Sequence, residues 1–304
     1  MTIENAEAAE GTVTVAEALS DSVSGPISES VPEPDSESVS APAASPDPAA
    51  DAVVLTGVGK VFGRPGPAHP PVLDGVDLRV AAGEFVCVLG ASGCGKSTLL
   101  NIIAGLEPAT TGEVLVHGVG PSHGRTSLMF QDAALFPWLT AGRNVELALR
   151  LRGVGRRERR AEAERLLGLV RLDGAGGKRV HELSGGMRQR VALARALAQG
   201  NRVLLMDEPF AALDAITRDV LHKEITRIWR ETGVAVLFVT HNVREAVRLA
   251  QRVVLMSSRP GRVVRDWTVD IPQPRRIEDA AVASLAVEIT DWLGREIRRH
   301  GDDG

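Results

Sequence analysis

A glycine-rich run between an apolar strand pattern and a helix pattern constrains the fold of this chain most strongly. Residues 90–98 read GASGCGKST, after the β-rich run 85–89 and before the helical pattern of 99–104. Glycines permit positive φ angles, so backbone N–H groups can point inward toward an anion, and the positive end of the following helix adds to them. This context predicts an α/β fold with a phosphate-binding loop and disfavours a plain glycine-rich turn. The residues expected to contact phosphates are Gly90, Ser92, Gly93, Cys94, Gly95, Lys96, Ser97 and Thr98.

Two adjacent carboxylates at the end of a second apolar strand pattern suit the same chemistry. Asp207 and Glu208 follow the run 202–206 and precede a proline that stops the strand. Lys96 would contact the β and γ phosphates, Ser97 would offer its hydroxyl to Mg²⁺, and Asp207 would hold that ion through its water shell. Glu208 could accept a proton from water that attacks the γ phosphate. Taken alone, the pair could also be a solvated acidic turn.

A third motif discriminates among phosphate-loop proteins. Residues 183–189 read LSGGMRQ, in which Ser184 can cap a helix whose first turn holds Gly185 and Gly186. Such a helix start leaves backbone N–H groups open toward an anion, although an ordinary helix cap has the same pattern. The run resembles the signature of ATP-binding cassette (ABC) ATPases. The resemblance covers roughly residues 53–265 and implies ATP and Mg²⁺ as ligands.

The resemblance also implies roles for three residues that follow apolar segments. Gln131 senses the γ phosphate and the metal and links to a membrane partner, so it joins Ser97 and Asp207 as an expected Mg²⁺ contact. Asp214 contacts the opposing subunit beside the nucleotide. His241 steadies the γ phosphate and counts with Glu208 and Gln131 as catalytic, although a lone histidine after a strand is usually only a polar strand end.

In this family the signature of one subunit closes over ATP held by the glycine loop of another. Ser184, Gly185, Gly186 and Gln189 are therefore expected to contact a nucleotide bound to a partner chain. This chain has one signature and one glycine loop, so the resemblance implies a head-to-tail pair, either a homodimer or a heterodimer with a paralogous subunit. Adenine is expected to stack on Phe62, which stands where tyrosine is more usual, with edge packing as the alternative.

Composition separates an acidic extension from a basic body. Residues 1–51 hold 11 of the 39 acidic residues and no Lys or Arg, so the rest of the chain is about seven charges positive. The extension is rich in Pro, Ser and Ala and is expected to be disordered, and it does not resemble a secretory signal. Arg-rich stretches of the body mix with acidic and apolar residues, which indicates solvated helix faces, with a membrane surface as a minor alternative, and not a nucleic-acid site.

Strand and helix patterns predict the domain organisation. Apolar strand-like runs are expected at 53–58, 78–80, 85–89, 114–117, 127–130, 203–206, 234–239 and 253–256. We expect an ABC ATPase domain over 52–268 with a mixed sheet core, a β subdomain and a helical subdomain at about 140–190 that carries the signature. Residues 269–304 should form an amphipathic helix that packs on this domain through Val282, Leu285, Ile289, Trp292 and Ile297.

Two further segments indicate the type of ABC protein. Residues 135–139, LFPWL, and 256–264, MSSRPGRVV, look like the ATPase subunits of nitrate, sulfonate and taurine importers. Phe136 and Trp138 would then lie in the groove that receives a helix of the permease, although they could simply pack beneath the helical arm. The chain has no apolar run of the ~18 residues that a membrane span requires.

The expected protein is thus an ATPase on the cytoplasmic face of the membrane. It would be held there by integral permease subunits and served indirectly by a substrate-binding protein. The two cysteines agree with a reducing compartment. The alternative is a soluble ABC ATPase without a permease, which would usually carry a coiled-coil insertion, zinc cysteines or two cassettes. A phosphate-loop kinase would have no use for the 183–189 motif.

Overall fold

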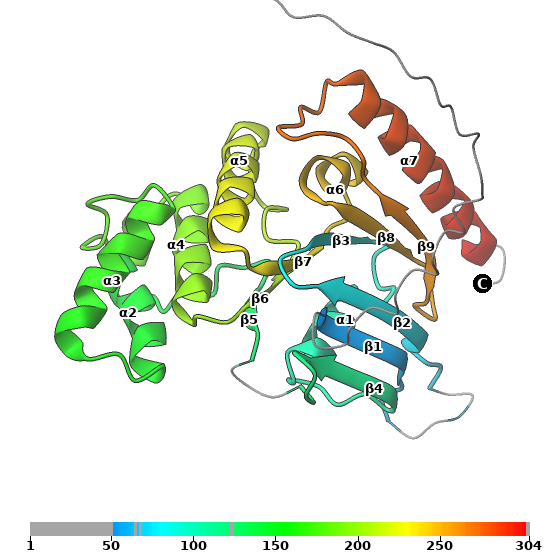
Figure 1. The fold of residues 1–304 in the computed structure, drawn as a ribbon, viewed down its shortest axis with the longest axis horizontal. Helices are drawn as coiled ribbons and strands as arrows, with labels where there is room; N and C mark the ends of the chain where they lie inside the picture. Colours follow the sequence, from blue (N-terminus) through cyan, green and yellow to red (C-terminus); the bar gives the residue numbers. More distant parts are fainter. Residues whose placement is uncertain (1–50, 64–65, 67–68, 122–124, 302–304) are drawn as a thin grey trace, which may run out of the picture. The chain divides into compact units, whose positions relative to one another are not determined.

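The computed structural model describes residues 51–301 except 64–65, 67–68 and 122–124. The predicted disordered extension, apart from Asp51, lies outside the described residues. Two β-sheets organise the described part (Figure 1). The smaller sheet is antiparallel with the order β2-β1-β4. Its strands are β1 (Asp51–Lys60), β2 (Leu73–Ala81) and β4 (Thr111–Val116).

The larger sheet has six strands in the order β5-β6-β7-β3-β8-β9, parallel except for the antiparallel edge strand β9. These strands are β3 (Phe85–Leu89), β5 (Ser127–Met129), β6 (Val203–Asp207), β7 (Ala235–Val239), β8 (Arg252–Met256) and β9 (Val263–Thr268). The eight predicted strands are confirmed as β1 to β8, and β9 was missed. Four of its residues are exposed, so it lacks the apolar run that identifies buried strands.

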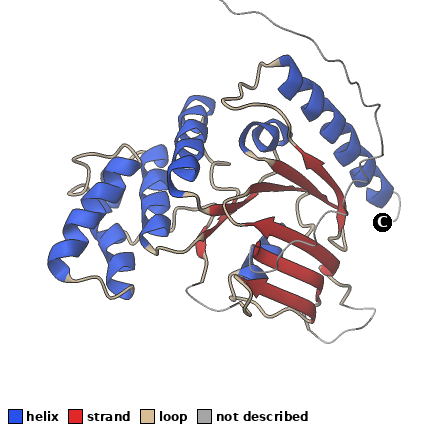
Figure 2. Cartoon of the chain, in the orientation of Figure 1, coloured by secondary structure: helices blue, strands red, loops and turns tan. Residues whose placement is uncertain are grey.

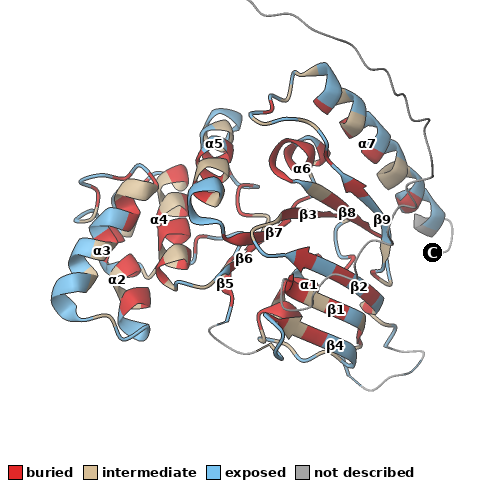
Figure 3. Ribbon diagram, in the orientation of Figure 1, coloured by how far each residue is buried: buried red, intermediate tan, exposed pale blue. Residues whose placement is uncertain are grey.

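Alternating side chains of the central strand β3 enter two hydrophobic cores. Phe85, Cys87 and Leu89 join the core shared with the helices α2 to α7, whereas Val86 and Val88 join the core between the two sheets. Burial on both faces explains why β3, β6 and β7 are continuous apolar runs, which appear as buried segments in Figure 3. The helix α1 (Lys96–Ile103) packs in the second core, directly after the glycine loop.

Helices and the loops that connect them make up the rest of the described chain (Figure 2). Between β5 and β6 there are helices and no strand, and α4 packs on both α2 and α3 and reaches β5. The helical elements are α2 (Ala141–Leu151), α3 (Arg156–Leu169), η1 (Val180–Glu182), α4 (Gly185–Ala198), α5 (Ala215–Thr232), α6 (Val243–Leu249) and α7 (Ala280–Gly301). Among the described residues, no helix combines the length and apolar character needed to cross a bilayer. The predicted domain boundaries remain a proposal.

The helix α7 contacts α6 and uses most of its predicted apolar stripe. Val282 and Ile289 are fully buried, and Leu285 and Trp292 pack against the same core. Ile297 is 47% exposed, so its expected burial was wrong. Helical spacing shows which face a residue occupies but not how far along the helix the neighbouring elements reach.

Candidate functional site

The glycine loop curls around the ammonium group of Lys96. This side chain is buried, and its Nζ donates hydrogen bonds to the carbonyl oxygens of Gly90 and Ala91, both at 2.9 Å. The loop closes at Gly95, which has a φ of +100° and caps α1 without a side-chain hydrogen bond. A Cβ atom there would lie 2.6 Å from Leu73 Cδ2, so only glycine fits. A cation is therefore fixed between the end of β3 and the start of α1, where a phosphate would meet backbone N–H groups.

The other loop residues differ in exposure. Ser92, Gly93 and Ser97 are exposed, and Thr98 is half-buried in the first turn of α1. Cys94 is buried, its Sγ lies 3.8 Å from Lys96 Nζ, and burial raises the pKa of its thiol, so it is a poor nucleophile. The structure thus leaves Cys94 only its backbone for contact with an anion.

The carboxylate of Asp207 lies beside Ser97. Asp207 ends β6, and the Ser97 hydroxyl lies near enough to its carboxylate to lower its pKa. Burial raises the pKa of Asp207 above its ordinary value, the charge of Glu208 adds to this rise, and Ser97 and Lys96 oppose it. The Ser97 hydroxyl and the Asp207 carboxylate, both predicted to hold Mg²⁺, therefore lie close together. Their oxygen atoms are the type of ligand that this ion prefers.

Glu208 follows in an uncommon backbone conformation. Its φ is +43°, in the left-handed region that costs free energy in a residue with a Cβ atom. Its backbone N–H donates to Val239 O at 3.0 Å, and its Oε2 lies 2.9 Å from His241 Nδ1. The ends of the parallel neighbours β6 and β7 thus bring together the predicted base and the predicted histidine. Sheet topology accounts for this contact between residues 33 positions apart.

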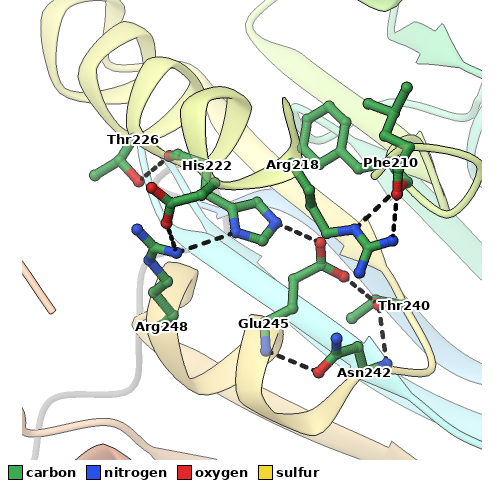
Figure 4. Close-up of polar contacts among 10 residues, drawn as sticks. Phe210, Arg218, His222, Thr226, Thr240, Asn242, Glu245 and Arg248 are labelled. Carbon is green, nitrogen blue, oxygen red and sulfur yellow. Dashed lines mark hydrogen bonds and ion pairs between the residues drawn. The ribbon is translucent and has the colours of Figure 1, made fainter. Parts of the chain in front are cut away.

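A buried polar network around Glu245 includes Thr240, the residue before His241 (Figure 4). Thr240 Oγ1 hydrogen bonds to Glu245 on α6, and Glu245 Oε1 lies 2.5 Å from His222 Nε2 on α5. Thr240, His222 and Glu245 are all at least nine-tenths buried. Sequence reasoning missed these residues. The available signal was a histidine on the apolar face of α5, next to Leu221 and in line with Ile225.

The signature begins α4 and lies against the start of α5. Ser184 caps α4 by accepting a hydrogen bond from Met187 N at 3.3 Å. Gly186 is buried, and a Cβ atom there would lie 2.3 Å from Thr217 Cγ2. Asp214 caps α5 by accepting from Thr217 N at 2.9 Å, and this hydrogen bond lowers the pKa of Asp214. Ser184 and Asp214 are both exposed, so the two helix starts form one surface.

Gln189 does not lie on that surface, and its role as a nucleotide contact stays a prediction. The side chain is buried, and its Nε2 donates to Gln131 O at 2.8 Å. A helix start exposes only its first turn, and Gln189 stands in the second. Gln189 therefore positions the backbone of exposed Gln131 after β5.

Phe62 lies at the far end of β1, with its side chain 47% exposed. Lys60 Nζ is 4.9 Å from its ring centroid and also donates to Glu107 Oε1 at 2.5 Å. Lys60 O accepts a hydrogen bond from Val72 N, and Val72 packs beside Gly95, so this strand end adjoins the glycine loop. The exposure of Phe62 favours a stacking surface over edge packing.

Arg259 is a loop contact that sequence reasoning missed. Its Nε donates to Gly93 O at 3.1 Å, and Gly261 lies so close to Cys94 O that a Cβ atom would be 2.2 Å away. The segment 256–264 was noted only for its family likeness, which carried no information about this contact. Residues 259–261 therefore contact the backbone of the glycine loop at Gly93 and Cys94.

An apolar cavity of about 620 Å³ lies between the β5 region, α2 and α4, next to the segment around Gln131. Its lining includes Phe130, Phe136 and Leu151, and Arg195 lies 5.9 Å from the ring of Phe136. Phe136 is half-buried, whereas Trp138 is 68% exposed, with the two ring centroids 5.4 Å apart. Packing against the helical subdomain therefore explains the position of Phe136, but it does not explain the exposed side chain of Trp138.

Comparisons with known proteins agree with this geometry. The family model described as ABC transporter matches residues 73–211. The taurine import ATP-binding protein TauB of Burkholderia pseudomallei is 51% identical over 201 residues, which cover 65% of this chain and 77% of that protein. The nitrate import ATP-binding protein NrtD of Synechocystis sp. is 47% identical over 203 residues, which cover 66% of this chain and 76% of that protein.

Solved structures give the same result. The dimeric structure of a post-hydrolysis state of the ATP-binding cassette MJ0796, bound to ADP and Pi, has 34% sequence identity and a TM-score of 0.63. The match covers 72% of this chain and 100% of that one. The structure of cbiO1 from Clostridium perfringens, part of the ABC transporter complex cbiONQ, has a TM-score of 0.65 at 23% identity, which supports the shared fold.

Proposed function

The chain belongs to the ABC transporter family and is an ATPase, and on this premise we propose that it drives an importer for a small anion of the nitrate, sulfonate or taurine type. The observation that carries the proposal is the convergence of Ser97, at the start of α1, with three residues at the ends of the parallel neighbours β6 and β7. These residues are Asp207, Glu208 and His241. The names of its relatives, taurine import and nitrate import ATP-binding proteins, support the choice of cargo.

The site residues fit MgATP as the substrate. Lys96 supplies a fixed positive charge for the β and γ phosphates, and its two carbonyl contacts hold it in place. Ser97 and Asp207, with Gln131, would hold Mg²⁺, which neutralises charge on the phosphate oxygens when bound. Glu208 accepts the proton of the attacking water, and His241 orients both Glu208 and the γ phosphate. Exposed Phe62 offers its ring to the adenine.

Two chains acting together complete each site. Ser184 and Asp214 lie exposed at the starts of α4 and α5, open to a partner's nucleotide. One chain carries one glycine loop and one signature, so a head-to-tail homodimer is the simplest assembly. The dimeric cassette among the structural relatives supports this arrangement.

The apolar cavity after Gln131 suits a helix of a permease subunit. Exposed Trp138 and the lining residues Phe130 and Leu151 form a hydrophobic surface next to the residue proposed to sense the γ phosphate. We place the chain at the cytoplasmic face of the membrane, attached through integral permease subunits that receive cargo from a substrate-binding protein. The alternative, a soluble ABC ATPase, gives this surface no occupant.

Purification from solubilised membranes tests the transporter proposal. The tagged chain should recover an integral membrane subunit, and Trp138→Glu should lose that subunit while retaining ATPase activity in solution. Arg157→Glu on the exposed face of α3 is a matched control that should recover it normally. Recovery of wild-type chain without any integral membrane protein would favour the soluble alternative.

A further inference from the structure

A cavity of about 360 Å³ lies between α5, α6 and the segment that leads to α7. Of its lining residues, five are cations and one, Glu231, is a carboxylate. The cations are Lys223, Arg227, Arg230, Arg248 and Arg275. The cavity is separate from the glycine loop, and none of the residues proposed above to bind nucleotide lines it. Such an excess of positive charge around a concave site favours an anion.

Three of the five cations are already paired with carboxylates. Lys223 Nζ lies 2.8 Å from Asp219, and Arg248 Nη1 lies 2.5 Å from the same carboxylate. Arg227 contacts Glu231 at 2.8 Å and also pairs with Glu224. Lys223, Arg227 and Arg248 therefore line the cavity but already have anionic partners.

Arg230 and Arg275 are the exceptions. Arg275 is buried, and among the described residues it donates to four backbone carbonyl oxygens, those of Ile271, Val247, Ala250 and Val269, at 2.5–2.9 Å. Arg230 donates to Gln273 Oε1 at 3.3 Å. Among the described residues, neither guanidinium has a carboxylate partner within salt-bridge distance. Carbonyl dipoles only partly offset a buried full charge.

The two unpaired guanidinium groups also repel each other across the cavity. Burial lowers the pKa of Arg275, and the positive charge of Arg230 lowers it further. Like charges that line one cavity and have no carboxylate within salt-bridge distance leave a position where an anion would relieve both. The exposed Arg230 guanidinium can offer paired N–H donors to an oxyanion such as sulfate or phosphate. Arg275 would act through its charge and one remaining N–H, because its Nε and both N–H groups of Nη1 are bound to carbonyl oxygens.

We propose that this cavity binds a small multivalent oxyanion of the sulfate or phosphate class between Arg230 and Arg275. Its volume is near the lower end of the ~300–1,000 Å³ found for ligand pockets, which suits an ion with a few waters. His222 and Arg248 also line the cavity, and they belong to the buried network around Glu245 (Figure 4). The bound ion would therefore join α5, α6 and the segment before α7 next to that network.

Calorimetric titration of sulfate and of inorganic phosphate tests the site. The full chain is first saturated with a non-hydrolysable analogue of MgATP, because either ion could otherwise enter the glycine loop or the γ-phosphate position, and sodium chloride at matched ionic strength corrects for screening. Wild-type chain should bind either ion saturably. Arg230→Gln should weaken binding about tenfold or more, because it removes one of two charged donors. Its side chain is exposed and bonds only to Gln273, so the variant should fold.

Arg276→Gln is the matched control. It removes the same charge next to Arg275, but Arg276 is exposed and does not line the cavity, so affinity should stay within about twofold. Lys96→Ala should also bind the ion normally when nucleotide is omitted. Absence of saturable binding, equal effects of Arg230→Gln and Arg276→Gln, or loss of binding in Lys96→Ala would each overturn the proposal.

Discussion

Glu208 combines a left-handed backbone with a carboxylate that contacts His241. If it is the general base, Glu208→Gln should bind MgATP with nearly unchanged affinity and lose about 10²-fold or more in kcat. Steady-state phosphate release and equilibrium nucleotide binding measure the two effects. Glu278→Gln, which removes an exposed carboxylate before α7, should leave both unchanged. Hydrolysis by Glu208→Gln at the wild-type rate would contradict the assignment.

The main expected role of Lys96 is to bind the phosphates of the nucleotide. Lys96→Ala removes the cation enclosed by the glycine loop, so nucleotide affinity should fall about tenfold or more. Fluorescence titration with a labelled ATP analogue measures it, with exposed Lys178→Ala as the control. Equal affinities in the two variants would show that the loop does not hold the phosphates.

Asp207 should lower the stability of the nucleotide-free chain. Its folded pKa is raised by burial, so between the unfolded and folded pKa values the folded state binds more protons and stability falls as pH rises. Asp207→Asn removes this cost, so its Tm should exceed that of wild type at neutral pH without metal. Below the ordinary Asp pKa of ~4 the difference should vanish. A neutral-pH Tm of Asp207→Asn below that of wild type would refute this explanation.

Among elements, α5 and α6 are joined by the pair of His222 and Glu245. Glu245→Ala would leave His222 and Thr240 buried without this partner, at a cost of about 3–5 kcal/mol. Urea unfolding should show the loss, and kcat should fall because Thr240 precedes His241. Glu245→Gln keeps an acceptor for Thr240 and should recover part of both. Wild-type stability and kcat in Glu245→Ala would exclude a positioning role.

The sequence predicted strands and motif order better than it predicted contacts between elements. The runs that became β3, β6 and β7 are buried on both faces, so composition alone revealed them. The polar edge strand β9 and the outward position of Ile297 depend on what lies beside them. The sequence could not show that Gln189 differs from the exposed residues of the signature. Its side chain points into the protein because α4 lies beside Gln131.

For the whole molecule, motif residues that are far apart in sequence meet because parallel strands end at one edge of the larger sheet. The order of the motifs therefore predicted the chemistry of Lys96, Glu208 and His241 before the fold was known. The supporting contacts of Glu245 and Arg259 came from packing, for which the sequence has no periodic signal.

Light scattering with size-exclusion chromatography tests most directly whether two chains share their nucleotides. Glu208→Gln with MgATP should double in mass from the 32.3 kDa chain, whereas the same protein with MgADP should remain single. Adding Ser184→Arg should prevent the doubling without reducing MgATP binding, since Ser184 would face the partner's nucleotide. A single-chain mass for Glu208→Gln at saturating MgATP, or doubling that persists with Ser184→Arg, would contradict the shared site.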